Sequence, residues 1–229
     1  MAARTYEDAC GIARSLDVIG ERWALLVVRE LVFGPKRFTD LRAGLHGISQ
    51  NVLSQRLRDL EASGIVRRIL LGPPASTHAY ELTDLGRQLE PVLIAMSRWG
   101  ALTPPPPEAE MSNDAFALAL KALFTPSTDG FVGRARLELV RDAFDVELGH
   151  DTIEVARAAG GSGAAGGPGG SGGPGSGPEL VIEGAESALR SVIFGRRTLP
   201  AAARAGDIRL EGSADAASAF LGRFRRPGS

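Results

Sequence analysis

Residues 49–63 constrain the fold most, because their hydrophobic period is that of an amphipathic helix. Leu53, Leu57 and Leu60 fall within about 60° of one another on a helical wheel and define a buried face. The opposite face carries a polar row made of Asn51, Ser54, Gln55 and Arg58. We therefore expect a helix that begins near Ser49, is stopped by the glycine after residue 63, and leaves this polar row exposed.

The polar row has the side-chain types that read base edges in a DNA major groove. Asn and Gln can pair with adenine, Arg with guanine, and Ser with base edges or phosphate. Any surface helix is polar outside, but such helices usually favour Glu and Lys, and here acids only flank the row at Asp59 and Glu61. The pattern therefore favours DNA reading over a plain solvated face. The predicted base-reading residues are Ser49, Gln50, Asn51, Ser54, Gln55 and Arg58.

The surrounding segments are predicted in the order of a winged helix-turn-helix domain. Expected before the polar row are helices over 8–19, 21–33 and 38–43 and a turn at 44–47. Expected after it are a hairpin over 65–71 and 79–82 with its exposed tip at 72–77, and a long helix that Thr83 caps and that reaches about residue 102.

Two apolar stripes support these helices. In the second helix the inward-facing positions are Trp23, Leu26, Val27 and Leu31, with Glu30 as the exception among them. In the last helix of this half the stripe consists of Leu85, Leu89, Val92, Leu93, Met96 and Trp99. Both stripes have the spacing of a helix with one packed face.

Positive charge is concentrated around the predicted reading helix. The chain as a whole has a net charge of -1, but residues 36–68 hold seven basic and three acidic side chains. Such a concentration is a candidate footprint for phosphates, although a solvated helix face often carries as much. The predicted phosphate contacts are Lys36, Arg37, Arg42 and Arg68.

Two composition breaks predict the domain organisation. The proline run at 104–107 cannot continue a helix and is typical of an extended linker, so we expect a linker over 104–109 between domains at 6–103 and 110–226. Residues 160–177 hold 11 of the 29 glycines, and we expect a disordered loop there. No Lys-Ser/Thr pair follows this loop and no GxGxxG opens a helix, which argues against a phosphate-binding loop.

The alternating apolar segments and helical segments of the second half predict an α+β domain, in which an antiparallel sheet with one buried face is covered by helices. The expected helices lie at 113–124, 186–194, 199–205 and 214–224. The expected strands lie around 137–139, 144–148, 153–155, 180–182 and 208–210.

Several classes of protein are disfavoured by what the sequence lacks. The single cysteine, Cys10, excludes an intramolecular disulfide and a cysteine-based zinc site, and the three histidines have no metal-ligand spacing. No apolar run is long enough to span a bilayer, and Glu7 and Asp8 stand where a signal peptide would be apolar, so we expect a cytoplasmic protein. We find no catalytic set or cofactor fingerprint, and therefore predict no enzyme, no metal and no cofactor.

The N-terminal half resembles the HxlR-type branch of the MarR-related winged helix-turn-helix regulators over roughly residues 6–103. The matching positions are Cys10, Ile12, Leu16, Val18 to Trp23, Gly34 to Leu41, Gly47 to Leu57, and Tyr80 to Thr83. The resemblance implies a DNA-binding homodimer with its terminal helices at the dimer contact. It also implies that the helix from Ser49 enters the major groove and that the hairpin 65–82 is the wing. A two-fold dimer would bind an inverted repeat.

Cys10 stands where several members of that family carry a redox-sensing cysteine. A sensing thiol needs access and a lowered pKa. Arg14 and the nearby helix end favour the thiolate, whereas Glu7 and Asp8 oppose it. An inert packing cysteine is the other interpretation.

The C-terminal half is similar in its order of elements to the sterol-carrier-protein-2-like fold, with Gly206 to Gly212 before the last helix. The resemblance implies a cavity between sheet and helices that can take an apolar small-molecule effector. The side chains that would either line it or form an ordinary core are Phe116, Leu120, Phe124, Phe144, Phe194 and Phe220.

Together these patterns predict a sequence-specific DNA-binding transcriptional regulator, a homodimer with a regulatory or dimer-supporting C-terminal domain. The alternative from another class is a lipid or small-molecule carrier whose winged helix serves only for dimerisation. The polar row favours the regulator, because its side chains are of the types that contact base edges.

Overall fold

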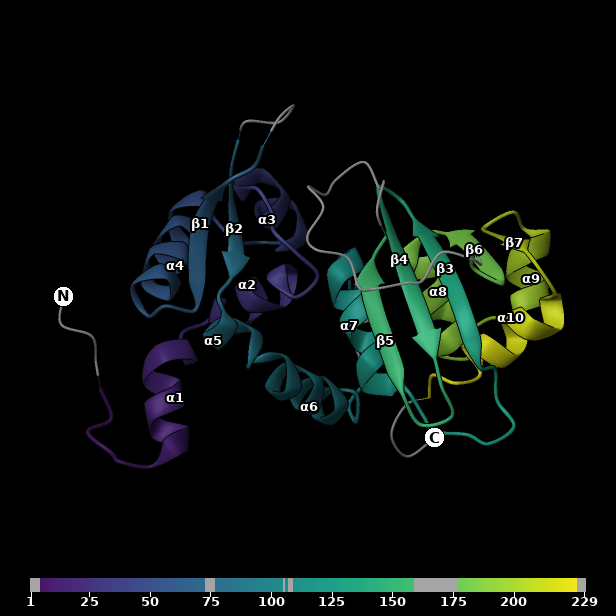
Figure 1. The fold of residues 1–229 in the computed structure, drawn as a ribbon, viewed down its shortest axis with the longest axis horizontal. Helices are drawn as coiled ribbons and strands as arrows, with labels where there is room; N and C mark the ends of the chain where they lie inside the picture. Colours follow the sequence, from purple (N-terminus) through teal and green to yellow (C-terminus); the bar gives the residue numbers. More distant parts are fainter. Residues whose placement is uncertain (1–4, 73–76, 105, 107–108, 159–176, 226–229) are drawn as a thin grey trace. The chain divides into compact units, whose positions relative to one another are not determined.

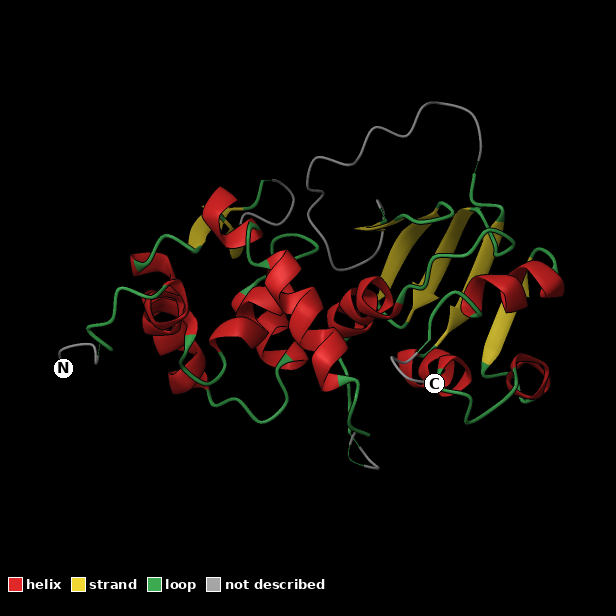
Figure 2. Cartoon of the chain, turned by 90° about the horizontal axis from the view of Figure 1, so that it is seen from below, coloured by secondary structure: helices red, strands yellow, loops and turns green. Residues whose placement is uncertain are grey.

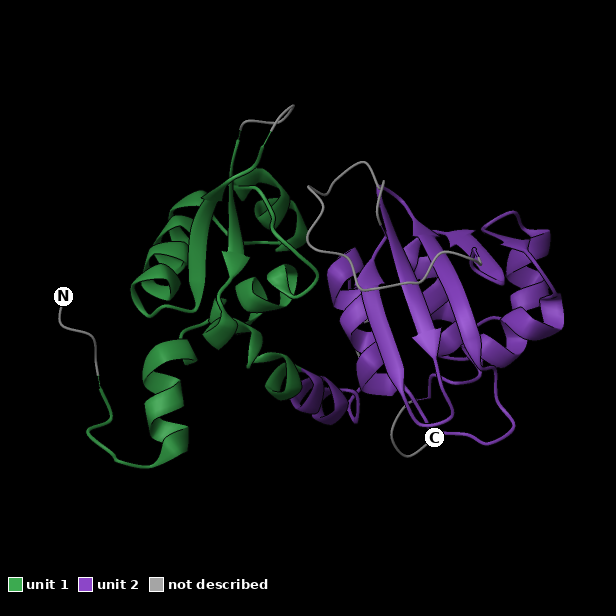
Figure 3. Ribbon diagram, viewed as in Figure 1, with its two compact units in different colours: residues 1–93 green, residues 94–229 purple. Residues whose placement is uncertain are grey.

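The computed structural model describes residues 5–72, 77–104, 106, 109–158 and 177–225. The chain divides into two compact units, residues 1–93 and 94–229, and each is described by itself (Figure 3). The boundary falls inside helix α6 (Glu90–Gly100), ahead of the predicted linker. The last turns of α6 belong to the second unit, where the Arg98 Nε donates to the carbonyl oxygen of Ala122 at 2.8 Å.

The first unit has the predicted order of helices, hairpin and helices (Figure 1). Its elements are α1 (Gly11–Ile19), α2 (Ala24–Leu31), α3 (Phe38–Gly44), α4 (Gln50–Ala62), β1 (Val66–Leu70), β2 (His78–Leu82), α5 (Asp84–Arg87) and the start of α6. A winged helix-turn-helix arrangement is thereby confirmed for this half of the chain.

Helix α4 has the bounds that its sequence predicts. The Ser49 hydroxyl accepts a hydrogen bond from the backbone N–H of Val52 at 3.3 Å and caps the first turn. Gly64 ends the helix in the left-handed region, with φ +70°. Leu53, Leu57 and Leu60 are buried, as the helical wheel requires.

Helix α2 differs from its prediction in start and orientation. It begins at Ala24 rather than Glu21, because Trp23 has a φ of +83° and cannot be part of a right-handed helix. Val28 is buried whereas Leu26 is 38% exposed, so the predicted inward stripe is wrong at Leu26. Helix α1 likewise begins three residues later than predicted, at Gly11.

The predicted single helix from Thr83 to residue 102 is two helices. Thr83 does cap a helix, its hydroxyl accepting from the Gly86 N–H at 3.1 Å, but this helix α5 ends at Arg87. Pro91 explains the break, because a proline lacks the N–H that would bond to the carbonyl of Arg87 and its ring clashes with that carbonyl. Helix α6 then begins at Glu90, with Pro91 in its first turn.

The wing is the antiparallel hairpin of β1 and β2, paired from Val66 with Leu82 to Leu70 with His78. Lys36 adds a short bridge to Tyr80, with backbone hydrogen bonds of 3.0 and 2.8 Å. Of the predicted hairpin tip, residues 73–76 lie outside the described residues.

The second unit is an α+β domain with a mixed five-stranded sheet (Figure 2). Its elements are α7 (Asn113–Leu123), β3 (Gly133–Leu139), β4 (Asp142–Leu148), β5 (Ile153–Arg157), β6 (Leu180–Gly184), α8 (Glu186–Ile193), α9 (Leu199–Arg204), β7 (Ile208–Glu211) and α10 (Ala214–Leu221). The strand order is β5-β4-β3-β6-β7.

The prediction of an entirely antiparallel sheet is wrong at one pair, because β3 and β6 run parallel. Parallel neighbours cannot be joined by a tight turn, and here β4, β5 and a long connection separate them along the chain. The predicted disordered loop at 160–177 belongs to that connection, and residues 159–176 lie outside the described residues. In the predicted linker, residues 105, 107 and 108 also lie outside them.

Alternation along the strands gives this sheet one buried face. Leu137 and Leu139 of β3 and Phe144 and Val146 of β4 are buried against the helices. Phe220 of α10 has no exposed surface, and its ring lies edge-on to those of Phe131 and Phe224, at centroid distances of 5.6 and 5.2 Å. The opposite face is charged and includes the ion pair of Arg136 with Asp145, at 2.8 Å.

Candidate nucleic-acid interface

The predicted polar row lies on the exposed side of α4. Gln50, Asn51, Gln55 and Arg58 are exposed, whereas Ser54 is half-buried. Ser49 is exposed but its hydroxyl is engaged as the helix cap. The structure therefore places all six predicted base-reading residues along one end or one side of a single helix, and five of them are exposed.

The row carries its own hydrogen bonds. The Arg58 Nη2 donates to the Gln55 Oε1 at 2.8 Å, and the Gln55 Nε2 donates to the Asp59 Oδ1 at 2.7 Å. Asp59 also pairs with Arg56 at 3.0 Å. Both ends of the Gln55 amide are thus occupied, while Arg58, with five N–H donors, keeps donors for a ligand. The flanking acid Asp59 orients Gln55, a role that sequence reasoning missed.

The predicted phosphate contacts fall into two groups. Arg37, Arg42 and Arg68 are exposed, and no hydrogen bond or ion pair ties their side chains to another described residue. Lys36 differs, because its Nζ lies 2.7 Å from the Glu30 Oε2 and its side chain is only 14% exposed. Its role as a phosphate contact stays a prediction, but in this structure its ammonium group is already paired.

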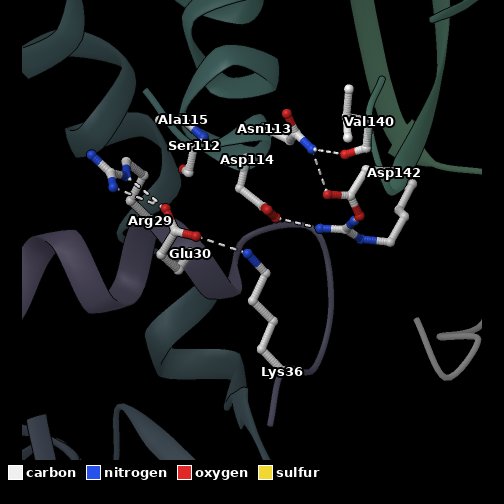
Figure 4. A network of polar contacts seen from close by, with 10 residues as sticks. Arg29, Glu30, Lys36, Ser112, Asn113, Asp114, Ala115, Val140 and Asp142 are labelled. Atoms are coloured by element: carbon white, nitrogen blue, oxygen red, sulfur yellow. Dashed lines mark hydrogen bonds and ion pairs between the residues drawn. The ribbon is translucent and has the colours of Figure 1, made fainter. Parts of the chain in front are cut away.

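Glu30 is a buried ion-pair residue of this unit to which sequence reasoning assigned no role. Its side chain has no exposed surface, and its Oε1 accepts from the Arg29 Nη2 at 2.9 Å while its Oε2 pairs with Lys36 (Figure 4). The available signal was an acid inside the predicted apolar stripe of α2. A carboxylate in such a position must be paired, since burial of an isolated charge is strongly unfavourable.

Exposed apolar side chains follow helical spacing on α1 and α6. Ile12 and Leu16 of α1 are exposed, as are Val92, Met96 and Trp99 of α6, with Trp99 at 77%. Of the predicted stripe in the last helix only Leu93 is buried. Exposed apolar side chains that repeat along one helix are candidates for an interaction face.

Cys10 stands at the N-cap position of α1, where its side chain makes no capping hydrogen bond, and it is exposed. Its backbone N–H donates to the Asp8 Oδ1 at 2.8 Å.

In the second unit, a small surface pocket beside α8 is lined by Pro106, Ala109, Ser187, Arg190, Ser191, Phe194 and Arg196. Phe194, predicted as a core or cavity residue, therefore lines this surface pocket instead.

Within the described residues, no three His, Cys, Asp or Glu side chains are grouped so that they could hold a metal ion. The same part of the chain has no helix with the length and apolarity that crossing a membrane requires.

Comparison with known proteins points to one family for the N-terminal part of the chain. The model of the HxlR-like helix-turn-helix family matches residues 18–106. The HTH-type transcriptional regulator YybR of Bacillus subtilis is 37% identical over 94 residues, which are 41% of this chain and 75% of YybR. The HTH-type transcriptional regulator Rv3095 of Mycobacterium tuberculosis is 39% identical over 97 residues, 42% of this chain and 61% of that protein.

Solved structures give matches over a similar share of the chain. The redox regulator HypR in its oxidized form is 37% identical, with a TM-score of 0.38, over 42% of this chain and 100% of HypR. The quinone-bound YodB from B. subtilis is 32% identical, with a TM-score of 0.35, over 40% of this chain and 97% of YodB.

Proposed function

This chain belongs to the HxlR-like helix-turn-helix family, and on that basis we propose that it is a sequence-specific regulator that binds double-stranded DNA as a homodimer. The observation that carries the proposal is the exposed row of α4. Asn51, Gln55 and Arg58 are not used to pack the helix against its own domain, although the opposite face is fully buried. An accessible helix face of hydrogen-bonding side chains is what major-groove reading requires.

Within this proposal, the side chains divide into two roles. Arg58 and Asn51 contact base edges, and Gln55 either contacts a base or holds Arg58 in position through their hydrogen bond. Arg37, Arg42 and Arg68 contact phosphates, because they are exposed cations in the same unit. Base contacts supply specificity, whereas phosphate contacts supply affinity that depends on salt.

The apolar faces of α1 and α6 support a homodimer. A second copy related by a two-fold axis would cover the exposed apolar side chains of α1, Ile12 and Leu16, and those of α6, Met96 and Trp99. Two recognition helices related in this way would read an inverted repeat, with half-site centres about 10 bp apart or a multiple of that.

For the second unit we propose a regulatory or dimer-supporting role, with a sterol-carrier-protein-2-like arrangement of sheet and helices. An apolar effector would have to enter between them. The edge-on packing of Phe220 with Phe131 and Phe224 favours a solid core over a preformed cavity. An effector must also bind the DNA-competent and DNA-incompetent states unequally, since equal affinity shifts nothing.

A redox role of Cys10 is proposed on the family resemblance, and the exposed thiol supports it. Peroxide would oxidise the thiolate to a sulfenic acid and release hydroxide. Peroxide should then change operator affinity in the wild-type chain and leave it unchanged in Cys10→Ser.

The test of the proposed function is selection of bound duplexes by the full-length chain from a random-sequence library, followed by affinity measurements from about 50 to 200 mM salt. Enrichment of an inverted repeat, with affinity that falls steeply with salt, is the expected result. A chain that enriches no duplex but melts at higher temperature with apolar ligands would instead be the carrier whose winged helix only dimerises.

A further inference from the structure

The buried Glu30 carboxylate joins three segments of the first unit. Glu30 and Arg29 belong to α2, and Lys36 lies on the segment that follows α2. Gly44, the last residue of α3, packs so closely that a side-chain carbon placed there would overlap the Glu30 carboxylate. Figure 4 shows the carboxylate between the guanidinium of Arg29 and the ammonium of Lys36.

Two of these contacts continue into the elements that would face DNA. The backbone of Lys36 pairs with Tyr80 of β2, so the ion pair fixes the wing relative to α2. Gly44 directly precedes the turn that leads into α4, so the close approach there fixes the position from which the reading helix starts. Ion pairs in low dielectric hold geometry firmly because a separated buried charge is so unfavourable.

We propose that Glu30 is a positioning residue for DNA binding, which sets the wing and the reading helix in register with each other, and that Lys36 acts through Glu30 rather than on a phosphate. This inference rests on the proposed function, since it assigns no role outside DNA binding. It explains why an acid interrupts the apolar face of α2, where an aliphatic side chain would pack without any ionic partner.

The first experiment separates positioning from plain stability. Glu30→Ala and Glu30→Gln are compared with Val28→Ala, a matched control on the same helix whose side chain is also wholly buried. Dissociation constants are measured below the melting range of every variant, on the duplex that the wild-type chain selects and on a scrambled duplex of equal length. Glu30→Ala should weaken binding to the selected duplex about 10-fold and to the scrambled duplex much less, because specific contacts need the correct register. Glu30→Gln should lie between, and Val28→Ala should match the wild type.

The second experiment approaches the carboxylate from its other side and does not depend on Glu30→Ala being stable. Gly44→Ala should displace the carboxylate and weaken specific binding by a similar factor. In the Glu30→Ala background the same substitution should cost nothing more, because the group it displaces is gone. If the loss of affinity in the double variant equals the product of the losses in the two single variants, the inference is overturned.

Salt dependence tests the role of Lys36. Arg37→Ala should reduce the slope of log affinity against log salt by about one, as loss of a phosphate contact does, and Lys36→Met should leave the slope nearly unchanged. Equal slopes for both variants would restore Lys36 as a phosphate contact and overturn the proposal. The proposal would also be overturned if Glu30→Ala and Val28→Ala bound the selected duplex with equal affinity. If the wild-type chain selects no duplex, the proposed function fails and this inference with it; if it does and Glu30→Ala binds equally well, the positioning role alone fails.

Discussion

The N-terminal unit buries an acid between two cations, whereas the C-terminal unit buries a base among carbonyl oxygens. Glu30 is neutralised by Arg29 and Lys36. Arg223 is 2% exposed, and no carboxylate lies within ion-pair distance of it among the described residues. Its guanidinium donates to the carbonyl oxygens of Thr125, Phe131, Gly149 and His150, at 3.1, 2.6, 2.9 and 2.8 Å.

The difference separates two uses of a buried charge. The four carbonyls around Arg223 belong to loops of its own unit, and the next residue, Phe224, forms a short bridge with Phe124. This arginine therefore holds the segment that follows α10 against the rest of the domain. Burial lowers the pKa of Arg223, because desolvation disfavours the charged guanidinium. The Glu30 contacts instead reach elements that would touch DNA. We infer that the Arg223 network serves stability and the Glu30 network serves geometry.

The largest expected effect concerns the interior of the C-terminal unit. Phe144→Ala should lower the free energy of unfolding of this unit by about 3 to 5 kcal/mol, through lost burial and a new cavity. Urea denaturation monitored separately for each unit would measure it, and the transition of the N-terminal unit should not move. A much smaller loss, with apolar ligands raising the wild-type melting temperature, would indicate a ligand cavity in place of a solid core.

A smaller loss is expected from Arg223→Met, on the order of 3 kcal/mol, because buried carbonyls lose their donors while the apolar stem is kept. Affinity for the selected duplex, measured where the variant is folded, should stay at the wild-type value. Reduced affinity in the folded variant would mean that the Arg223 network also supports DNA binding, and the contrast with Glu30 would disappear.

The smallest expected effect comes from a substitution on α4, which should change DNA affinity and leave the stability of the fold unchanged. Arg58→Ala should weaken binding to the selected duplex by about 10- to 100-fold and relax preference at one position per half-site, with no change in melting temperature. Arg37→Ala serves as the control, because loss of a phosphate contact should weaken all sequences alike. Equal losses on selected and scrambled duplexes for both variants would contradict the assigned roles.

Local patterns in the sequence predicted most elements of both units. The spacing of Leu53, Leu57 and Leu60, the Ser49 cap and the glycine after residue 63 predicted α4, because each of these signals acts within a few residues. The break at Pro91 and the left-handed Trp23 were local too, but they compete with a helical period that continues through them. Periodicity outweighed them in the prediction, whereas in the structure the backbone geometry prevailed.

The sequence by itself therefore determined which face of α4 is polar, the order of helices and hairpin in the winged helix-turn-helix, and that a second α+β unit follows. Only the tertiary structure decided that Lys36 pairs with a buried Glu30, that Leu26 is exposed while Val28 is buried, and that β3 and β6 run parallel. The physical reason is the range of the interactions. Helix period, caps and turn residues act between near neighbours in the chain, whereas strand order and burial of a charge depend on contacts between segments that only folding brings together.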